Sequence, residues 1–149
     1  MKLVPLALAT GVVAVVASTA TAAAVSGPSC NLASPKSVKS ALGITVGAPS
    51  VTKNATVTVC QFATTAGLLV RFQTSETPSL FAFGRKSFAK HGEPTKTVNG
   101  LGTEAYSSTF AGGKSNTIVV LKNKTELLIT GSEPLAKLEA LAKIILPSL

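Results

Sequence analysis

Residues 30–60, CNLASPKSVKSALGITVGAPSVTKNATVTVC, contain both cysteines of the chain and decide how its first half folds. Ser34-Pro35 is typical of a helix start and Gly43 of a helix end, so a short first helix is predicted between them. The β-branched residues before Cys60 predict a strand. A disulfide between Cys30 and Cys60 would tie the N-terminal arm to that strand, and closing a loop of about 30 residues stabilises a small domain by roughly 3–4 kcal/mol.

The first 24 residues have the composition of a secretory signal peptide. Lys2 precedes an apolar run over residues 3–17, and small residues with A-x-A cleavage choices follow up to Ala24. The run is shorter than the roughly 20 apolar residues that span a membrane. We therefore predict a cleaved signal peptide over residues 1–24, no transmembrane span, and a single secreted domain over residues 25–149.

Export bears on the role of the two cysteines. In an oxidising compartment they most simply form one structural disulfide. Lipid attachment to Cys30 is the alternative, but Gly27-Pro28-Ser29 precede it, whereas a lipobox has leucine three places before the cysteine and no proline. The sequence therefore favours an extracellular protein without a lipid anchor.

The charge of the mature chain is strongly basic. Removing Lys2 from the 14 basic residues leaves 13 against 6 acidic ones, a formal net charge of +7, and every acidic residue is glutamate. Such a balance favours anionic partners, including envelope polymers, through general electrostatics, and it also keeps a secreted protein soluble. Charge alone does not choose between these roles.

The middle of the chain predicts a hairpin and then a helix. Residues 55–62 and 68–73 are rich in strand formers around a Thr-Thr-Ala-Gly turn, and Arg71 lies on the face opposite Val70 and Phe72. Thr77-Pro78 then predicts the start of a second helix that reaches Gly92. Its apolar stripe is predicted to contain Leu80, Phe81, Gly84 and Phe88, with Arg85, Lys86 and Lys90 lying away from that stripe.

Three further strands and a last helix complete the pattern. The strands are predicted over residues 104–110, 117–122 and 125–130, and the last helix is predicted to be capped by Ser132 and to end before Pro147. The second and third of these strands are apolar on both faces, which predicts the centre of a sheet covered by helices. The order α-β-β-α-β-β-β-α predicts an α+β domain with a mostly antiparallel five-stranded sheet and helices packed on it.

Several short motifs resemble one family. They are a cysteine before the Ala41-Leu42-Gly43 helix end, Cys60-Gln61-Phe62, the segment Val98-Asn99-Gly100-Leu101-Gly102-Thr103-Glu104-Ala105, and the closing Leu138-Glu139-Ala140-Leu141-Ala142 helix. Over residues 30–146 the chain looks like the small secreted proteins and lipoproteins of actinobacteria that are catalogued as a domain of unknown function. The resemblance implies a cell-envelope protein with a PsbP-like sheet-and-helix fold, and it implies no catalytic residue.

Nucleotide motifs do not fit their context. Gly113-Lys114-Ser115 resembles the end of a phosphate loop, but Ser108 stands where that loop needs glycine, and a strand follows instead of a helix. Residues 100–105 match a loose G-x-G-x-x-A pattern, but the residues that follow favour a strand. Both segments are interpreted as turns, and no cofactor is expected.

Catalytic groups are scarce. His91 is the only histidine, there is no Asp and no G-x-S-x-G motif, and the glutamates show no metal-ligand spacing. Paired glutamates could still hydrolyse a glycoside, although the chain has no Trp and a single Tyr to stack sugars. The phenylalanines mostly occupy predicted core positions, which argues against specific nucleic-acid binding.

The sequence therefore predicts an exported, non-enzymatic binding or interaction module of the bacterial cell envelope. Its partner would be an anionic envelope polymer, a small apolar ligand or another protein, and the protein is expected to be a monomer. A cationic, polyanion-binding or defence-type protein is the alternative, and a hydrolase is a weaker one. The ligand groove is expected beside the second helix and the glycine-containing loop, and its candidate binding residues are Arg71, Arg85, Lys86, Lys90, Gly100 and Gly102.

Overall fold

The structure is a computed structural model that describes residues 27–65 and 67–149, so the predicted signal peptide lies outside the described residues. Its α-helices are α1 (Pro35–Leu42), α2 (Pro78–Lys90) and α3 (Leu135–Ile145). Its short 3-10 helices are η1 (Cys30–Ala33), η2 (Ala111–Gly113) and η3 (Leu146–Ser148). Its strands are β1 (Ser50–Lys53), β2 (Val57–Gln61), β3 (Leu69–Thr74), β4 (Thr95–Thr97), β5 (Glu104–Phe110), β6 (Ser115–Lys122) and β7 (Thr125–Gly131).

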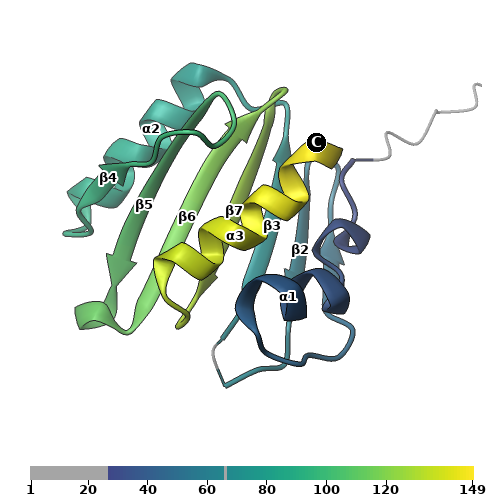
Figure 1. Ribbon diagram of the computed structural model, residues 1–149. Coiled ribbons are helices and arrows are strands. Elements are labelled where there is room, and N and C mark those ends of the chain that lie inside the picture. The colour runs from purple at the N-terminus through teal and green to yellow at the C-terminus, as the bar shows by residue number, and fades with distance from the viewer. Residues whose placement is uncertain (1–26, 66) are drawn as a thin grey trace, which may run out of the picture.

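The seven strands found in the described residues form one antiparallel sheet in the order β1-β2-β3-β7-β6-β5-β4 (Figure 1). The predicted α+β class is confirmed, but the predicted number of five strands is wrong. The two missed strands, β1 and β4, form the two edges of the sheet. All of β1 is exposed and β4 has only three residues, so neither shows the alternation of buried and exposed side chains that identifies a strand.

Helices cover both faces of the sheet. On one face α1 and α3 pack over the main core, and in Figure 1 α3 crosses the front of the sheet diagonally. On the opposite face α2 lies over the β4 side, where Phe81 packs against Tyr106, Val119 and Leu121. The prediction that the two apolar strands, β6 and β7, lie inside the sheet and are covered by helices is confirmed.

The first two helices begin where the sequence predicts. The hydroxyl of Ser34 accepts a hydrogen bond from the amide of Ser37 at 3.2 Å, and the hydroxyl of Thr77 accepts one from the amide of Leu80 at 3.2 Å. Gly43 ends α1 with a φ of 75°. These are the N-cap and C-cap arrangements that the sequence indicates.

Three predicted details of the helices are wrong. Pro134, not Ser132, occupies the N-cap of α3, because its backbone is extended (ψ 142°) and the helix begins only at Leu135. In α2, Leu80 is 53% exposed and does not belong to the buried stripe. Arg85, predicted to lie away from that stripe, is half-buried, because α2 is rotated so that this side chain meets β4 and β5.

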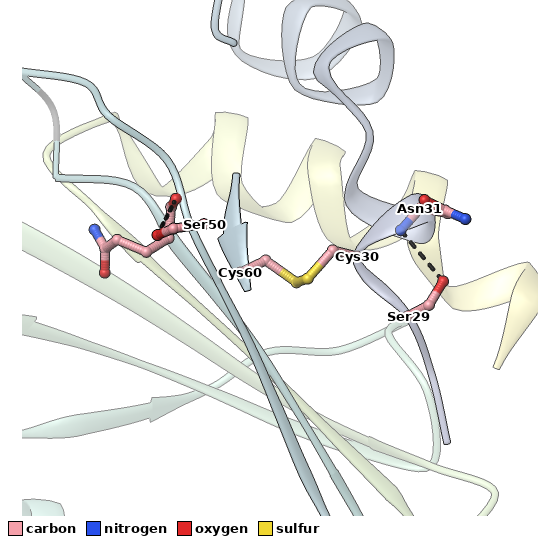
Figure 2. The surroundings of a disulfide bond; sticks show 6 residues. Ser29, Cys30, Asn31, Ser50 and Cys60 are labelled. Carbon is pink, nitrogen blue, oxygen red and sulfur yellow. Dashed lines mark hydrogen bonds between the residues drawn. A yellow bond between two sulfur atoms is a disulfide. The ribbon is translucent and has the colours of Figure 1, made fainter. Parts of the chain in front are cut away.

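The Cys30–Cys60 disulfide is confirmed and joins η1 to β2, with the two α-carbons 5.7 Å apart. Figure 2 shows its surroundings: Ser29 accepts a hydrogen bond from the amide of Asn31, and Ser50 donates one to the carbonyl oxygen of Gln61, beside Cys60. Such a bridge fits an oxidising compartment. Within the described ranges, no helix is long and apolar enough to cross a membrane.

Candidate functional site

The connection between β4 and β5 holds the glycine pair that the sequence singled out. We call residues 99–103 the glycine loop. Two backbone hydrogen bonds fix its ends: the amide of Val98 donates to Ala105 of β5 at 3.0 Å, and the amide of Thr103 donates to Leu121 of β6 at 2.7 Å. The loop is therefore attached to the two strands beside it.

The interior of the loop is held by one buried side chain and one close backbone contact. Leu101 is 3% exposed and packs into the main core. Gly102 has a φ of 59°, and a Cβ atom at this position would overlap the carbonyl oxygen of Leu121 and a methyl group of Val120. Only glycine lets the loop approach β6 this closely.

The backbone of the loop offers several hydrogen-bond donors. Gly100 (φ 78°) and Gly102 (φ 59°) have positive φ, whereas Asn99 and Leu101 do not, so the sign of φ alternates along the loop. No described residue accepts a hydrogen bond from the amides of residues 99–102. Successive free amides in an alternating backbone are a common way to bind an anion.

Arg85 is held rigidly beside this loop. Its Nε donates to Thr95 Oγ1 at 3.2 Å, and its Nη2 donates to Thr97 Oγ1 at 2.9 Å, both on β4. Its guanidinium carbon also lies 5.7 Å from the centroid of the Tyr106 ring. Two hydroxyl acceptors and a ring face fix the orientation of the guanidinium while leaving its positive charge unneutralised.

A small cavity lies between Arg85 and the loop, and we call it the Arg85 pocket. Its volume is about 180 Å³, and it is lined by Arg85, Thr97 and residues 98–105. It is large enough for a carboxylate, sulfate or phosphate group. Glu104 also lines it, but this carboxylate forms no ion pair with Arg85.

A larger, open cleft of about 640 Å³ lies on the other side of the loop. We call it the lysine cleft, and it is lined by Gly100, Leu101, Gly102, Thr103, Lys122, Asn123, Lys143, Leu146 and Pro147. The ammonium group of Lys122 donates to the carbonyl oxygen of Leu146, at the end of α3. The described residues contain two ion pairs, and neither involves Arg85, Lys122 or Lys143. Three cations without a carboxylate partner therefore surround one loop.

Arg71, a predicted binding residue, lies elsewhere and is neutralised. Its guanidinium forms an ion pair with Glu126 of β7, which is 6% exposed. Glu76, 3% exposed, accepts a hydrogen bond from Gln73 at 2.9 Å. Burial raises the pKa of the Glu76 carboxyl, the nearby Glu126 carboxylate raises it further, and Gln73 and Arg71 partly offset the change. Because Arg71 is already paired with Glu126, it is a poor anchor for an anionic ligand.

Tyr106 supports Arg85 and does not offer a proton. Its ring packs against Phe81 at 5.2 Å and Phe88 at 5.6 Å between centroids. Burial raises the pKa of its phenol well above the usual range, and the Glu126 carboxylate raises it further, so the hydroxyl stays protonated at neutral pH. Within residues 27–65 and 67–149, no group of three His, Cys or Glu side chains is arranged to hold a metal ion.

The structure brings together three of the six predicted binding residues: Arg85, Gly100 and Gly102 all line the Arg85 pocket. Lys86 and Lys90 are exposed on α2, and Arg71 belongs to the separate cluster. Sequence reasoning missed Lys122 and Lys143. They lie at the end of β6 and in α3, and no local motif marks them, because they meet only where the helix crosses the sheet.

Comparisons with known proteins add no assignment. No protein-family model matches the chain, and neither the curated proteins nor the solved structures contain a significant match.

Proposed function

We propose that the protein is an exported, non-enzymatic binding module of the bacterial cell envelope that recognises an anionic group at its glycine loop. Export is supported by the signal-type N-terminal sequence and by the disulfide. The basic net charge of the chain would draw an anionic ligand toward the site.

The observation that carries the proposal is the geometry of Arg85. Its guanidinium is oriented by Thr95 and Thr97 and has no carboxylate partner among the described residues. It lines the pocket together with residues 99–102, whose backbone amides donate to no described residue. Charge-assisted hydrogen bonds to a guanidinium and to backbone amides are the usual means by which proteins hold carboxylate and phosphate groups.

Binding without catalysis fits the acid and base groups near this face of the sheet. Glu76 and Glu126 are buried, so neither is presented to a substrate in solution. The phenol of Tyr106 keeps its proton. His91 lies exposed at the C-cap of α2, after the last helical residue. Glu104 is the only acidic residue among those described that line the Arg85 pocket, so it has no second carboxyl group there with which to divide the acid and base roles.

A titration with inorganic phosphate tests the proposal. Isothermal calorimetry at low salt should show weak binding, with a dissociation constant of roughly millimolar size. Arg85→Gln should weaken it about tenfold or more, because a hydrogen bond to a charged group contributes about 1.5–3 kcal/mol. Arg85→Lys should recover only part of the affinity, since an ammonium group cannot reproduce the planar contacts to Thr95 and Thr97.

The matched control is the double change Lys86→Gln with Lys90→Gln. It removes two exposed charges from the same helix without touching the pocket, so phosphate affinity should stay within about threefold of that of the unchanged protein. Equal losses in the control and in Arg85→Gln would mean that general charge, not the glycine loop, attracts anions. Thermal unfolding of each variant checks that the fold is retained.

A further inference from the structure

The Arg85 pocket and the lysine cleft are two sides of the same short segment. Residues 100–103 line both cavities, so only the thickness of the glycine loop separates them. A ligand with more than one charged group could therefore lie across the loop and occupy both cavities at once. This possibility depends on the proposed anion binding at the loop.

The charges on the two sides match such a ligand. Arg85 lies on one side, and Lys122 and Lys143 lie on the other. Glu104 is the only carboxylate among the described residues that line these cavities, and it belongs to the Arg85 pocket. A single phosphate group in the smaller cavity would leave the two lysines without an anionic partner.

The two lysines of the cleft differ in how far they are available to a ligand. Lys122 is already fixed by the Leu146 carbonyl, whereas Lys143 is exposed and forms no ion pair within the described residues. Lys143 is therefore the cation most available to a ligand in the cleft.

We infer that the ligand is a linear polyanion with repeated charged groups that crosses the glycine loop. One anionic group lies beside Arg85 and a later group of the same chain lies beside Lys143. Once the first group is bound, the second binds at a high effective concentration, so affinity rises with the number of linked charges.

The test compares inorganic phosphate, tripolyphosphate and long-chain polyphosphate by calorimetry at one salt concentration. Affinity, corrected for the number of possible binding registers, should rise at least about tenfold from phosphate to tripolyphosphate or to the longer chain. Lys143→Gln should remove most of that gain while leaving phosphate affinity within about threefold. Lys90→Gln, which removes an equal charge from an exposed position on α2, should leave the gain intact.

Three outcomes would overturn the inference. The first is phosphate binding that depends on Arg85 but does not strengthen with chain length. The second is an equal effect of Lys143→Gln and Lys90→Gln, which would indicate general attraction only. The third is tighter binding of a fatty acid such as laurate than of polyphosphate, with the affinity for laurate lost in Lys143→Gln. All three leave anion binding at Arg85 in place, whereas failure of every anion to bind would reject the proposed function itself.

Discussion

Gly102 and Gly100 both have positive φ, but only Gly102 touches the sheet. A Cβ atom at Gly102 would overlap the Leu121 carbonyl oxygen and Val120, whereas a Cβ atom at Gly100 would meet nothing within 4 Å. Gly100→Ala therefore costs only the backbone strain of a left-handed residue, about 1 kcal/mol. Gly102→Ala adds a steric overlap and should cost roughly 2–4 kcal/mol.

Urea unfolding of the two variants measures this difference in the free energy of unfolding. Gly100→Ala is the matched control, since it changes the same residue type in the same loop. Equal destabilisation by the two changes would contradict the close approach of the loop to β6.

The pKa of Glu76 makes a second prediction at the scale of one residue. Burial and the Glu126 carboxylate raise the pKa in the folded state, so ionised Glu76 opposes folding at neutral pH. This penalty is removed as the pH falls through the raised folded pKa, and below the ordinary value of 4.5 both states are protonated. Glu76→Gln should therefore stabilise the protein at pH 7 and have little effect near pH 4.

The measurement is the free energy of unfolding of both proteins across this pH range. Gln73 can still bond to the introduced side chain, so its hydrogen bond at 2.9 Å need not be lost. A variant that is less stable than the unchanged protein at pH 7 would contradict the predicted direction.

At the scale of elements, the disulfide is the covalent link between η1 and β2. It closes a loop of about 30 residues, so replacing both cysteines with alanine should lower the free energy of unfolding by roughly 3–4 kcal/mol. Chemical denaturation of the oxidised protein and of the Cys30→Ala, Cys60→Ala variant measures this difference. The unchanged protein under reducing conditions serves as the control and should lose a similar amount. A loss below about 1 kcal/mol would show that packing alone holds η1.

The elements also show how far sequence reasoning reached. The starts of α1 and α2 were predictable because their capping signals are local: the hydroxyl groups of Ser34 and Thr77 accept hydrogen bonds from amides three residues ahead. The edge strands β1 and β4 were missed, because pairing with β2 and β5, not side-chain pattern, holds them in the sheet. The start of α3 was predicted too early. Its N-cap residue, Pro134, forms no side-chain capping hydrogen bond, so no local capping signal marks where the helix begins.

The candidate site also contains residues that the sequence indicated and residues that it did not. Gly100 and Gly102 were visible because an unusual residue pair marks a turn, and Arg85 because it lies on a polarised helix. The contact between Arg85 and Tyr106 was not predictable, since that contact depends on how α2 is rotated on the sheet. Lys122 and Lys143 were missed because their proximity depends on where α3 crosses β6.

At the scale of the whole molecule, the contribution of the positive net charge to phosphate affinity should differ from that of the Arg85 pocket in its dependence on salt concentration. The screening length falls from about 10 Å at 0.1 M salt to roughly 4 Å at 0.5 M. Lys86 and Lys90 act only through the general field, so their double change to glutamine should weaken phosphate binding about twofold at 0.1 M and hardly at all at 0.5 M. Arg85→Gln should weaken binding at both concentrations. An NMR titration of the three proteins measures these affinities, and a deficit of the double variant that persists at 0.5 M would contradict this separation.

The central claim is that the glycine loop and Arg85 together form an anion site, and the most direct measurement follows the backbone amides of residues 99–103 during a phosphate titration by NMR. We expect these amide resonances, with that of Thr97, to shift in a saturable manner in the unchanged protein and to shift far less in Arg85→Gln. Saturable shifts confined to the exposed part of α2 around Lys86 and Lys90, with the loop amides unmoved, would contradict the claim.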